Sequence, residues 1–426
     1  MKIMCVGDIH MGRDPLARKH PDEINILSPT DAWYRAVELA INDEVEALLL
    51  AGDVVDQDAG YYGVWDAFET GIKRLSKAGI RSYGVAGNHD AVTLPRLARV
   101  VKDFTLLGLD GTWEYAGLDG SNTGILGWSF PSRHSHKNPF HDESFTRVLE
   151  SVPGQCIGLL HCDMVPSSPY APVSPSQLQQ DKVFAWCLGH IHKPDFQLRG
   201  SRWCGYLGSL MGLHPNEDGA RGPWIMETGV SAPIVRQIPI APLRWEKLNI
   251  SLDRLKSISE MDYHISQSVE NIDAQLSTEN CRSEVVGLRI SLIGRTDQLA
   301  TVRDYCRKRE WEALVQRHGD RLFFIDDMDC LAARPERSLQ ETARGTDPLA
   351  SAARMILSLV QNDAHAKALI LEAKPELKRE ALVSAWSPLK PIEYNDEIVR
   401  KYLLNAACQV YDALDSQQNL IRGEDR

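Results

Sequence analysis

The chain has 426 residues, more than one compact core usually contains, so two or three domains are expected. A net charge of −11 argues against a protein that coats nucleic acid through its overall charge, but it does not exclude an enzyme that grips phosphates locally. No apolar run is long enough to span a membrane, and the nine cysteines contain no CxxC pair, so neither a zinc knuckle nor a disulfide framework is suggested.

The start of the chain alternates between strand and helix patterns. Buried strands are expected at residues 2–7, 46–51 and 82–86, and helices at about 30–42 and 62–78, the first capped by Thr30 and Asp31. The alternation predicts a parallel βαβ arrangement. The first residues enter a strand directly, so we expect no signal peptide and a reducing, cytoplasmic compartment.

The pattern changes after residue 100. Short strands between Gly-rich turns at 104–130 suggest antiparallel pieces, a helix is expected near 141–151, and buried strands at 156–160 and 184–188. Further strands are expected near 194–198, 203–207, 224–228 and 233–239. We therefore expect a sheet that begins parallel and ends antiparallel, with a second sheet packed on it, in a domain covering residues 1–242.

Three segments follow this domain. Residues 243–330 predict a small α/β unit, with strands at 285–293 and 321–325 and helices at 253–273 and 297–309. Residues 331–345 are expected to be a linker. Residues 346–426 are expected to be helical, with helix starts at Asp347-Pro348 and at Asn395, and with an apolar stripe from Val399 to Leu414 that is either a packing face or a partner surface.

Polar side chains follow five of the predicted strands. These stretches are Asp8-x-His10, Gly52-Asp53-x-x-Asp56, Gly87-Asn88-His89-Asp90, His161 and Gly189-His190-x-His192. Open α/β sheets place their chemistry at the carboxyl ends of strands. A donor set rich in Asp, His and Asn and poor in Cys suits two close divalent cations such as Mn, Fe or Zn, with a carboxylate such as Asp53 between them.

The five stretches, in this order, resemble the signature of the calcineurin-like metallophosphoesterases, and within that superfamily the SbcD-type nucleases of DNA double-strand break repair. The likeness covers residues 1–240 well, on the motifs, the long loop Gly12–Ser28 and the stretches 206–209 and 217–227. The resemblance implies a four-layer β-sandwich flanked by helices, followed by a small α/β cap and a helical tail.

The resemblance also implies roles for individual residues. Asp8, His10, Asp53 and His192 would hold one metal ion, and Asp53, Asn88, His161 and His190 the other, with Mn²⁺ as the expected metal. His89 would be the catalytic histidine, because a ring beside the site can stabilise phosphoryl charge or protonate the leaving oxygen. Asp90 would orient that ring, and Asp56 would have a supporting role.

A DNA nuclease of this type is expected to form a homodimer, to bind an SMC-like or SbcC-like coiled-coil ATPase, and to have no membrane attachment. Candidate DNA contacts are Arg13, Arg18, Lys19 and Arg133, although ordinary surface charge would also explain them. His134, His136 and His141 are expected to lie in a solvated or substrate-contacting loop rather than to form a further metal site. Cys162 and Cys187 are expected to be small buried residues.

Two other functions are compatible with the same motifs. A phosphoesterase for nucleotides or other small molecules would use the same core, but it would not need the extension after residue 242. A scaffold that has lost the chemistry usually lacks metal ligands, and none is missing here.

Overall fold

The computed structural model describes residues 1–14, 27–56, 61–118, 123–229, 233–253, 255, 257–333, 336–383 and 395–423. They form two compact units. The first comprises Met1–Lys247, Val269–Arg289 and Val315–Asp326, and the second comprises Leu248–Ser268, Ile290–Leu314 and Asp327–Arg426.

The first unit begins with a six-stranded sheet in the order β12-β11-β1-β2-β3-β4. Strands β1 (Lys2–Val6), β2 (Ala47–Leu50), β3 (Arg81–Gly84) and β4 (Phe104–Leu106) are parallel neighbours. Strands β11 (Trp224–Glu227) and β12 (Ile234–Gln237) extend the sheet in antiparallel fashion from β1. The expected change from parallel to antiparallel pairing is therefore confirmed.

A second six-stranded sheet has the order β5-β6-β7-β8-β10-β9. Strands β6 (Thr123–Trp128), β7 (Gln155–His161), β8 (Val183–Gly189) and β10 (Arg202–Tyr206) are parallel, and the edge strands β5 (Trp113–Gly117) and β9 (Gln197–Arg199) are antiparallel to their neighbours. Only the β5–β6 pair matches the antiparallel pieces expected at 104–130. The prediction of antiparallel pairing was wrong for β4, which is parallel to β3, and for β6, which is parallel to β7.

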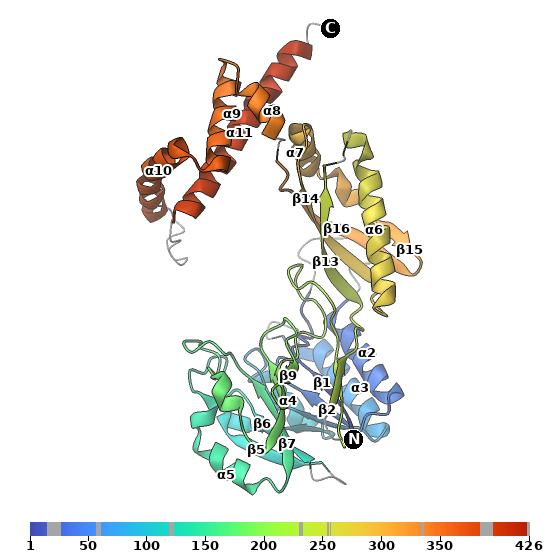
Figure 1. The fold of residues 1–426 in the computed structure, drawn as a ribbon. Coiled ribbons are helices and arrows are strands. Elements are labelled where there is room, and N and C mark those ends of the chain that lie inside the picture. Colours follow the sequence, from blue (N-terminus) through green and yellow to red (C-terminus); the bar gives the residue numbers. More distant parts are fainter. Residues whose placement is uncertain are drawn as a thin grey trace. The chain divides into compact units, whose positions relative to one another are not determined.

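The two sheets pack face to face, and helices cover their outer faces (Figure 1). The residues of β1 alternate between the two faces of the first sheet. Ile3 and Cys5 point to a core cluster shared with β6, β7 and β8 of the second sheet, whereas Met4 and Val6 point to the cluster beneath the helices. Helices α2 (Pro29–Asn42) and α3 (Tyr61–Lys77) cover the first sheet, and α5 (Glu143–Ser151) packs on the second. The predicted four-layer α/β sandwich is confirmed.

The N-cap of helix α2 lies two residues earlier than its sequence suggests. Ser28 is the N-cap, because its hydroxyl accepts from the backbone N–H of Asp31 while the Asp31 carboxylate accepts from the backbone N–H of Ser28. This reciprocal arrangement satisfies two N–H groups that a helix start otherwise leaves unpaired. The prediction was therefore wrong for Thr30, whereas Asp31 does take part in the cap, from the third helical position, and Pro29 takes the first.

The remaining strands follow residue 242. A four-stranded sheet has the order β13-β14-β16-β15, with β13 at Leu243–Ser251, β14 at Val285–Ile293, β15 at Gln316–His318 and β16 at Arg321–Cys330. The helices of the chain not yet placed are α4 (Thr93–Val100), α6 (Met261–Thr278), α7 (Leu299–Lys308), α8 (Glu336–Thr342), α9 (Pro348–Gln361), α10 (Ala364–Val383) and α11 (Asp396–Gly423).

The helical tail agrees with two predicted helix starts. Asp347 caps α9, with its carboxylate accepting from the backbone N–H of Ala350 at 2.7 Å, and α11 begins at Asp396. The segment expected to be a linker contains α8. Of the predicted apolar stripe, Leu403 and Leu414 pack against a cluster that contains Ile356 and Leu359 of α9, whereas Ala406 and Val410 are exposed. Within the described residues, no helix has the length and apolar character needed to cross a membrane.

Candidate metal centre

The seven predicted ligands come together where parallel strands of both sheets end. Asp8 and His10 follow β1, Asp53 follows β2, and Asn88 follows β3. His161 is the last residue of β7, and His190 and His192 follow β8. Because both sheets direct these strand ends to one edge, residues far apart in the chain become neighbours.

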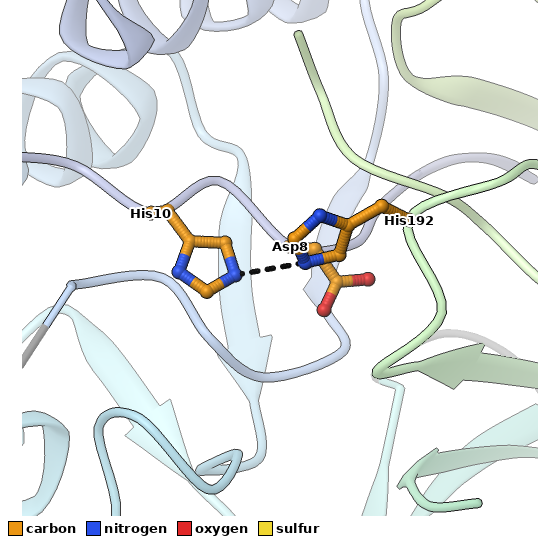
Figure 2. A group of neighbouring side chains, drawn as sticks. All are labelled: Asp8, His10 and His192. Carbon is orange, nitrogen blue, oxygen red and sulfur yellow. Dashed lines mark hydrogen bonds between the residues drawn. The ribbon is translucent and has the colours of Figure 1, made fainter. Parts of the chain in front are cut away.

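The first group of donors is Asp8, His10 and His192 (Figure 2), with one ligand atom from each lying within 4.8 Å of the others. The Nε2 atoms of His10 and His192 face each other at 3.2 Å. Two nitrogens bound to one cation at ~2.1 Å and near a right angle would lie about 3.0 Å apart. This pair of imidazoles therefore has the spacing of two ligands on one ion.

The second group is centred on Asn88. Its Oδ1 lies 3.0 Å from His161 Nε2 and 3.2 Å from His190 Nδ1. The Nδ1 of His161 lies 3.0 Å from the Ala51 carbonyl, which can only accept, so Nδ1 carries the proton. Burial lowers the pKa of His161, so the ring is neutral and its Nε2 lone pair faces the lone pairs of Asn88 Oδ1. A cation between these two acceptors removes that conflict.

Asp53 lies between the two groups. Its Oδ2 is 3.6 Å from His10 Nε2 and 3.4 Å from His161 Nε2, and its Oδ1 accepts from the backbone N–H of His89 at 2.8 Å. A carboxylate in contact with both sets of imidazoles has the position of a bridging ligand. The donor set and its spacing fit two divalent cations.

The backbone of this site is strained. Four of the seven donors have positive φ although none is glycine: Asp8 at 39°, His10 at 52°, Asp53 at 49° and His190 at 103°. Such conformations cost about 1–3 kcal/mol each and persist only where the surrounding fold enforces them. Here they turn the chain sharply after each buried strand, so that the side chains point at one another.

Asp90 does not orient His89, so that expectation was wrong. Its carboxylate is fully buried and accepts from the backbone N–H groups of Gly87 and Val54, both at 2.7 Å. It thereby ties the loop after β3 to the loop after β2. Burial, followed by the charge of Asp53, raises the pKa of Asp90 to about 8.

Asp56 lies nearer to the site histidines than Asp90 does. Its carboxylate is 3.3 Å from His10 Nδ1 and 4.0 Å from His89 Nδ1. His89 stands edge-on to His10, with ring centroids 4.8 Å apart, and its side chain is 31% exposed. His10 and His161 are fully buried, so His89 is placed to meet a substrate arriving from solvent.

Burial also affects the pKa values of His190 and His192. Burial, together with the neighbouring His161, lowers the pKa of His190 to about 4, so its ring is neutral and available as a ligand. His192 differs: burial would lower its pKa, but the hydrogen bond to Glu217 and the nearby carboxylates outweigh burial and raise it.

Sequence reasoning missed Glu217 as part of the centre. Its Oε1 lies 2.8 Å from His192 Nδ1. A lone glutamate in a loop gives no local signal, since its partner is 25 residues away in the chain. Tyr170 was also missed. Its ring lies 4.9 Å from that of His190, and it links His190 to His134 of the histidine-rich loop, 5.6 Å away.

The other candidate residues lie outside the cluster of donors. Arg13 is half-buried just after His10, and Arg133 is exposed. Arg18 and Lys19 lie outside the described residues. His134, His136 and His141 belong to none of the groups of described residues that could hold a metal. Cys162 and Cys187 are fully buried, as expected, and burial raises the pKa of the Cys162 thiol.

Gly189 allows β8 to pass close to the end of β2. A Cβ at this position would lie 2.0 Å from the Ala51 carbonyl oxygen and 2.8 Å from His161 Nδ1. Gly189→Ala should therefore displace His161 and weaken metal binding by about 10- to 100-fold, as expected when a ligand's partner is disturbed. Titration calorimetry with Mn²⁺ measures this. Gly63→Ala, where nothing lies within 4 Å, is the control, and equal affinities would contradict the prediction.

Comparison with known proteins finds a family that the first part of the chain matches. Residues 1–194 match the calcineurin-like phosphoesterase family. The chain is 26% identical over 262 residues to the DNA double-strand break repair protein Mre11 of Aeropyrum pernix, covering 56% of this chain and 61% of that protein. It is 22% identical over 276 residues to the uncharacterized metallophosphoesterase YhaO of Bacillus subtilis, covering 61% and 65%.

A further relative is Mre11 of Methanosarcina mazei, 27% identical over 216 residues, covering 49% of this chain and 33% of that protein. Among solved structures, a dimetal phosphatase from Danio rerio aligns with a TM-score of 0.37 and 12% identity, covering 56% of this chain and 95% of that one. The chain spans less than two thirds of the length of each of the three curated relatives. Its first 194 residues form a calcineurin-like phosphoesterase domain, the fold of a metal-dependent hydrolase.

Proposed function

We propose that this protein is a metal-dependent DNA nuclease of the SbcD type, which hydrolyses phosphodiester bonds at DNA ends or in single strands. The observation that carries the proposal is the meeting of seven Asp, His and Asn donors in two groups joined by Asp53. The similarity to the two Mre11 proteins supports DNA as the substrate.

In this proposal, the first metal position is held by Asp8, His10, Asp53 and His192, and the second by Asp53, Asn88, His161 and His190. Two divalent ions in such a site supply an activated water and stabilise negative charge on the phosphoryl group. Mn²⁺ is the expected metal, and the same donors accept Fe or Zn.

Side chains beside the metal positions are proposed to donate protons and to bind the DNA phosphates. His89 donates a hydrogen bond to the phosphoryl group or a proton to the leaving oxygen, because it is the most exposed of the imidazoles at the centre. The Asp56 carboxylate lies 4.0 Å from His89 Nδ1 and is not among the proposed metal ligands. Arg13 and Arg133 are proposed to contact DNA phosphates, as are Arg18 and Lys19.

The proposal extends to domains and partners. Residues 1–242 form the catalytic domain, 243–330 a cap, 331–345 a linker and 346–426 a helical region that docks on an SbcC-like or other SMC-like coiled-coil ATPase. The protein acts as a homodimer in the cytoplasm, in DNA repair or in defence against foreign DNA.

A comparison of two substrates tests the function. With Mn²⁺ present, we expect the protein to degrade linear DNA, alone or with an SbcC-like ATPase added, and to lose this activity when EDTA removes the metal. A chromogenic small diester such as bis-p-nitrophenyl phosphate is the second substrate. Hydrolysis of the small diester without any cleavage of DNA, with or without the ATPase, would contradict the nuclease proposal and favour a small-molecule phosphodiesterase.

A further inference from the structure

The loop after β10 carries Glu217, and both of its carboxylate oxygens make hydrogen bonds within the protein. One oxygen of Glu217, Oε1, lies 2.8 Å from His192 Nδ1. The other, Oε2, accepts from the Ser209 hydroxyl at 3.1 Å and from the Leu213 backbone N–H at 3.0 Å. The Glu217 side chain is 17% exposed, so this is not an ordinary surface ion pair.

The bond to Glu217 determines which nitrogen of His192 carries the proton. A carboxylate accepts, so Nδ1 of His192 donates to it. Nε2 then presents its lone pair on the opposite side of the ring, where it lies 3.2 Å from His10 Nε2 (Figure 2). A ring held through one nitrogen in this way is fixed in both orientation and tautomer.

The loop that carries Glu217 is itself fastened at several points. Trp245 of β13 accepts from the backbone N–H of Gly219 at 2.9 Å through its carbonyl, and its indole N–H donates to the Gly212 carbonyl at 3.3 Å. Lys247 of the same strand pairs with Asp218 at 2.7 Å. These contacts lie on both sides of Glu217, so its carboxylate is held in place before any ligand arrives.

The backbone of His192 is fixed by the same segment. Ser209 donates its backbone N–H to the His192 carbonyl at 2.9 Å, and the Arg221 guanidinium donates to the same carbonyl. Arg221 is only 3% exposed. Both the ring and the main chain of His192 therefore depend on residues 209–221.

We propose that Glu217 is a positioning residue for the metal centre, which sets the tautomer and direction of His192 and thereby the affinity of the first metal position. The inference rests on the proposed two-metal site and adds a residue outside the ligand set. Loss of such a partner typically lowers metal affinity by about 10- to 100-fold.

The test is metal titration of the full-length chain. Glu217→Ala should weaken Mn²⁺ binding at one of two sites by about 10- to 100-fold, leave the other site unchanged, and recover turnover at high Mn²⁺. Glu217→Gln keeps the shape of the side chain, but its single amide oxygen can accept from only one of His192 Nδ1–H and Leu213 N–H, and its NH2 group must face the other. This variant should therefore fall between Glu217→Ala and wild type. Asp218→Ala is the matched control, since its carboxylate pairs with the exposed Lys247 rather than with a ligand, and the two hydrogen bonds of Trp245 still hold the loop.

A second readout does not depend on metal. Nitrogen-15 NMR of the metal-free protein should show the Nδ1–H form of His192 in the wild type and its loss in Glu217→Ala. Unchanged Mn²⁺ affinities in both variants would overturn the inference, and Glu217→Gln alone decides if Glu217→Ala fails to fold. A wild type that binds no pair of ions would instead contradict the proposed function.

Discussion

His89→Ala should lower kcat on DNA by about 10²- to 10⁴-fold, the range that a positioned acid or hydrogen-bond donor contributes. The ring is the most exposed imidazole of the centre, at 31% against 22% for His192 and 15% for His190. Its backbone N–H, which the substitution keeps, is the group that bonds Asp53. We therefore expect KM to change little and both metal ions to remain bound. Single-turnover kinetics and metal analysis of the purified variant measure both effects.

A matched control distinguishes catalysis from ligation. Asn88→Ala removes the amide oxygen that faces His161 and His190, so it should lose activity together with one metal ion. His89 lies within reach of His10 and Asp53, close enough to offer a ligand atom of its own. Loss of a metal ion from His89→Ala would show that it is a ligand and would contradict the role given to it here.

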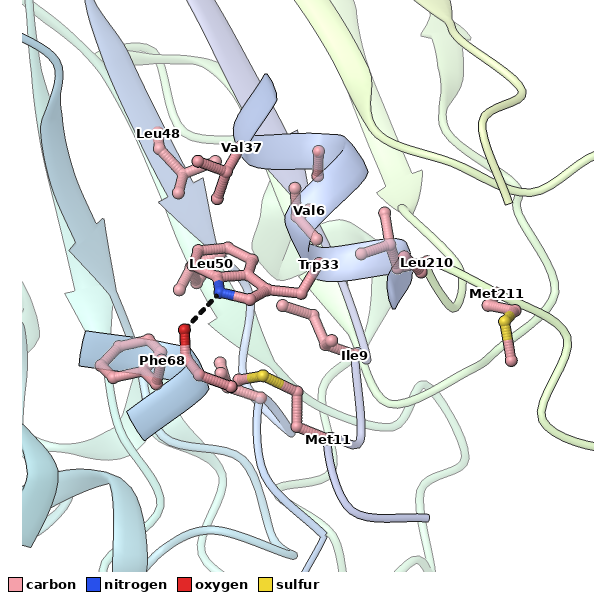
Figure 3. Close-up of a cluster of buried hydrophobic side chains, with 14 of the residues drawn as sticks. Val6, Ile9, Met11, Trp33, Val37, Leu48, Leu50, Phe68, Leu210 and Met211 are labelled. Atoms are coloured by element: carbon pink, nitrogen blue, oxygen red, sulfur yellow. Dashed lines mark hydrogen bonds between the residues drawn. The ribbon is translucent and has the colours of Figure 1, made fainter. Parts of the chain in front are cut away.

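Trp33→Ala should lower the free energy of unfolding of the first unit by about 3–5 kcal/mol, as large-to-small changes of buried aromatic residues do. Trp33 of α2 is fully buried in the core cluster that α2 and α3 share with the first sheet, stacks on Phe68 of α3 and donates to the Ala67 carbonyl at 3.1 Å (Figure 3). A Cβ on Gly71 would meet its indole at 2.4 Å, so the ring is tightly enclosed. Urea denaturation followed by circular dichroism measures the loss.

The control for Trp33 lies on the same helix. Glu38 is exposed and pairs with Arg74 at the surface, and exposed ion pairs contribute about 0–1 kcal/mol, so Glu38→Ala should change stability by no more than that. If Trp33→Ala cost as little as Glu38→Ala, the packing of α2 on the first sheet would be contradicted.

Much of the centre could be predicted because its signals are local. Buried strands such as β2 and β8 appear as short apolar runs, and the donors follow each run within a few residues. The parallel alternation of strands and helices then implies that these ends share one edge. The strand at Val285–Ile293 was located for a similar reason, since its polar and apolar residues alternate.

What could not be predicted depends on contacts between distant parts of the chain. Glu217 meets His192 only because β10 and the following loop return to the metal centre. Asp90 adjoins His89 in sequence, yet its carboxylate faces backbone N–H groups of two loops. The three residues of β4 are too few to reveal the direction of their pairing. Ser28 was passed over because Thr30 and Asp31 also favour helix starts.

Anomalous diffraction from crystals grown with Mn²⁺ tests the central claim most directly. We expect two manganese peaks about 3.5–4 Å apart, with Asp53 between them and Asp8, His10 and His192 on one side. Asn88, His161 and His190 should surround the other peak. A single peak, or ions bound away from these seven side chains, would contradict the account.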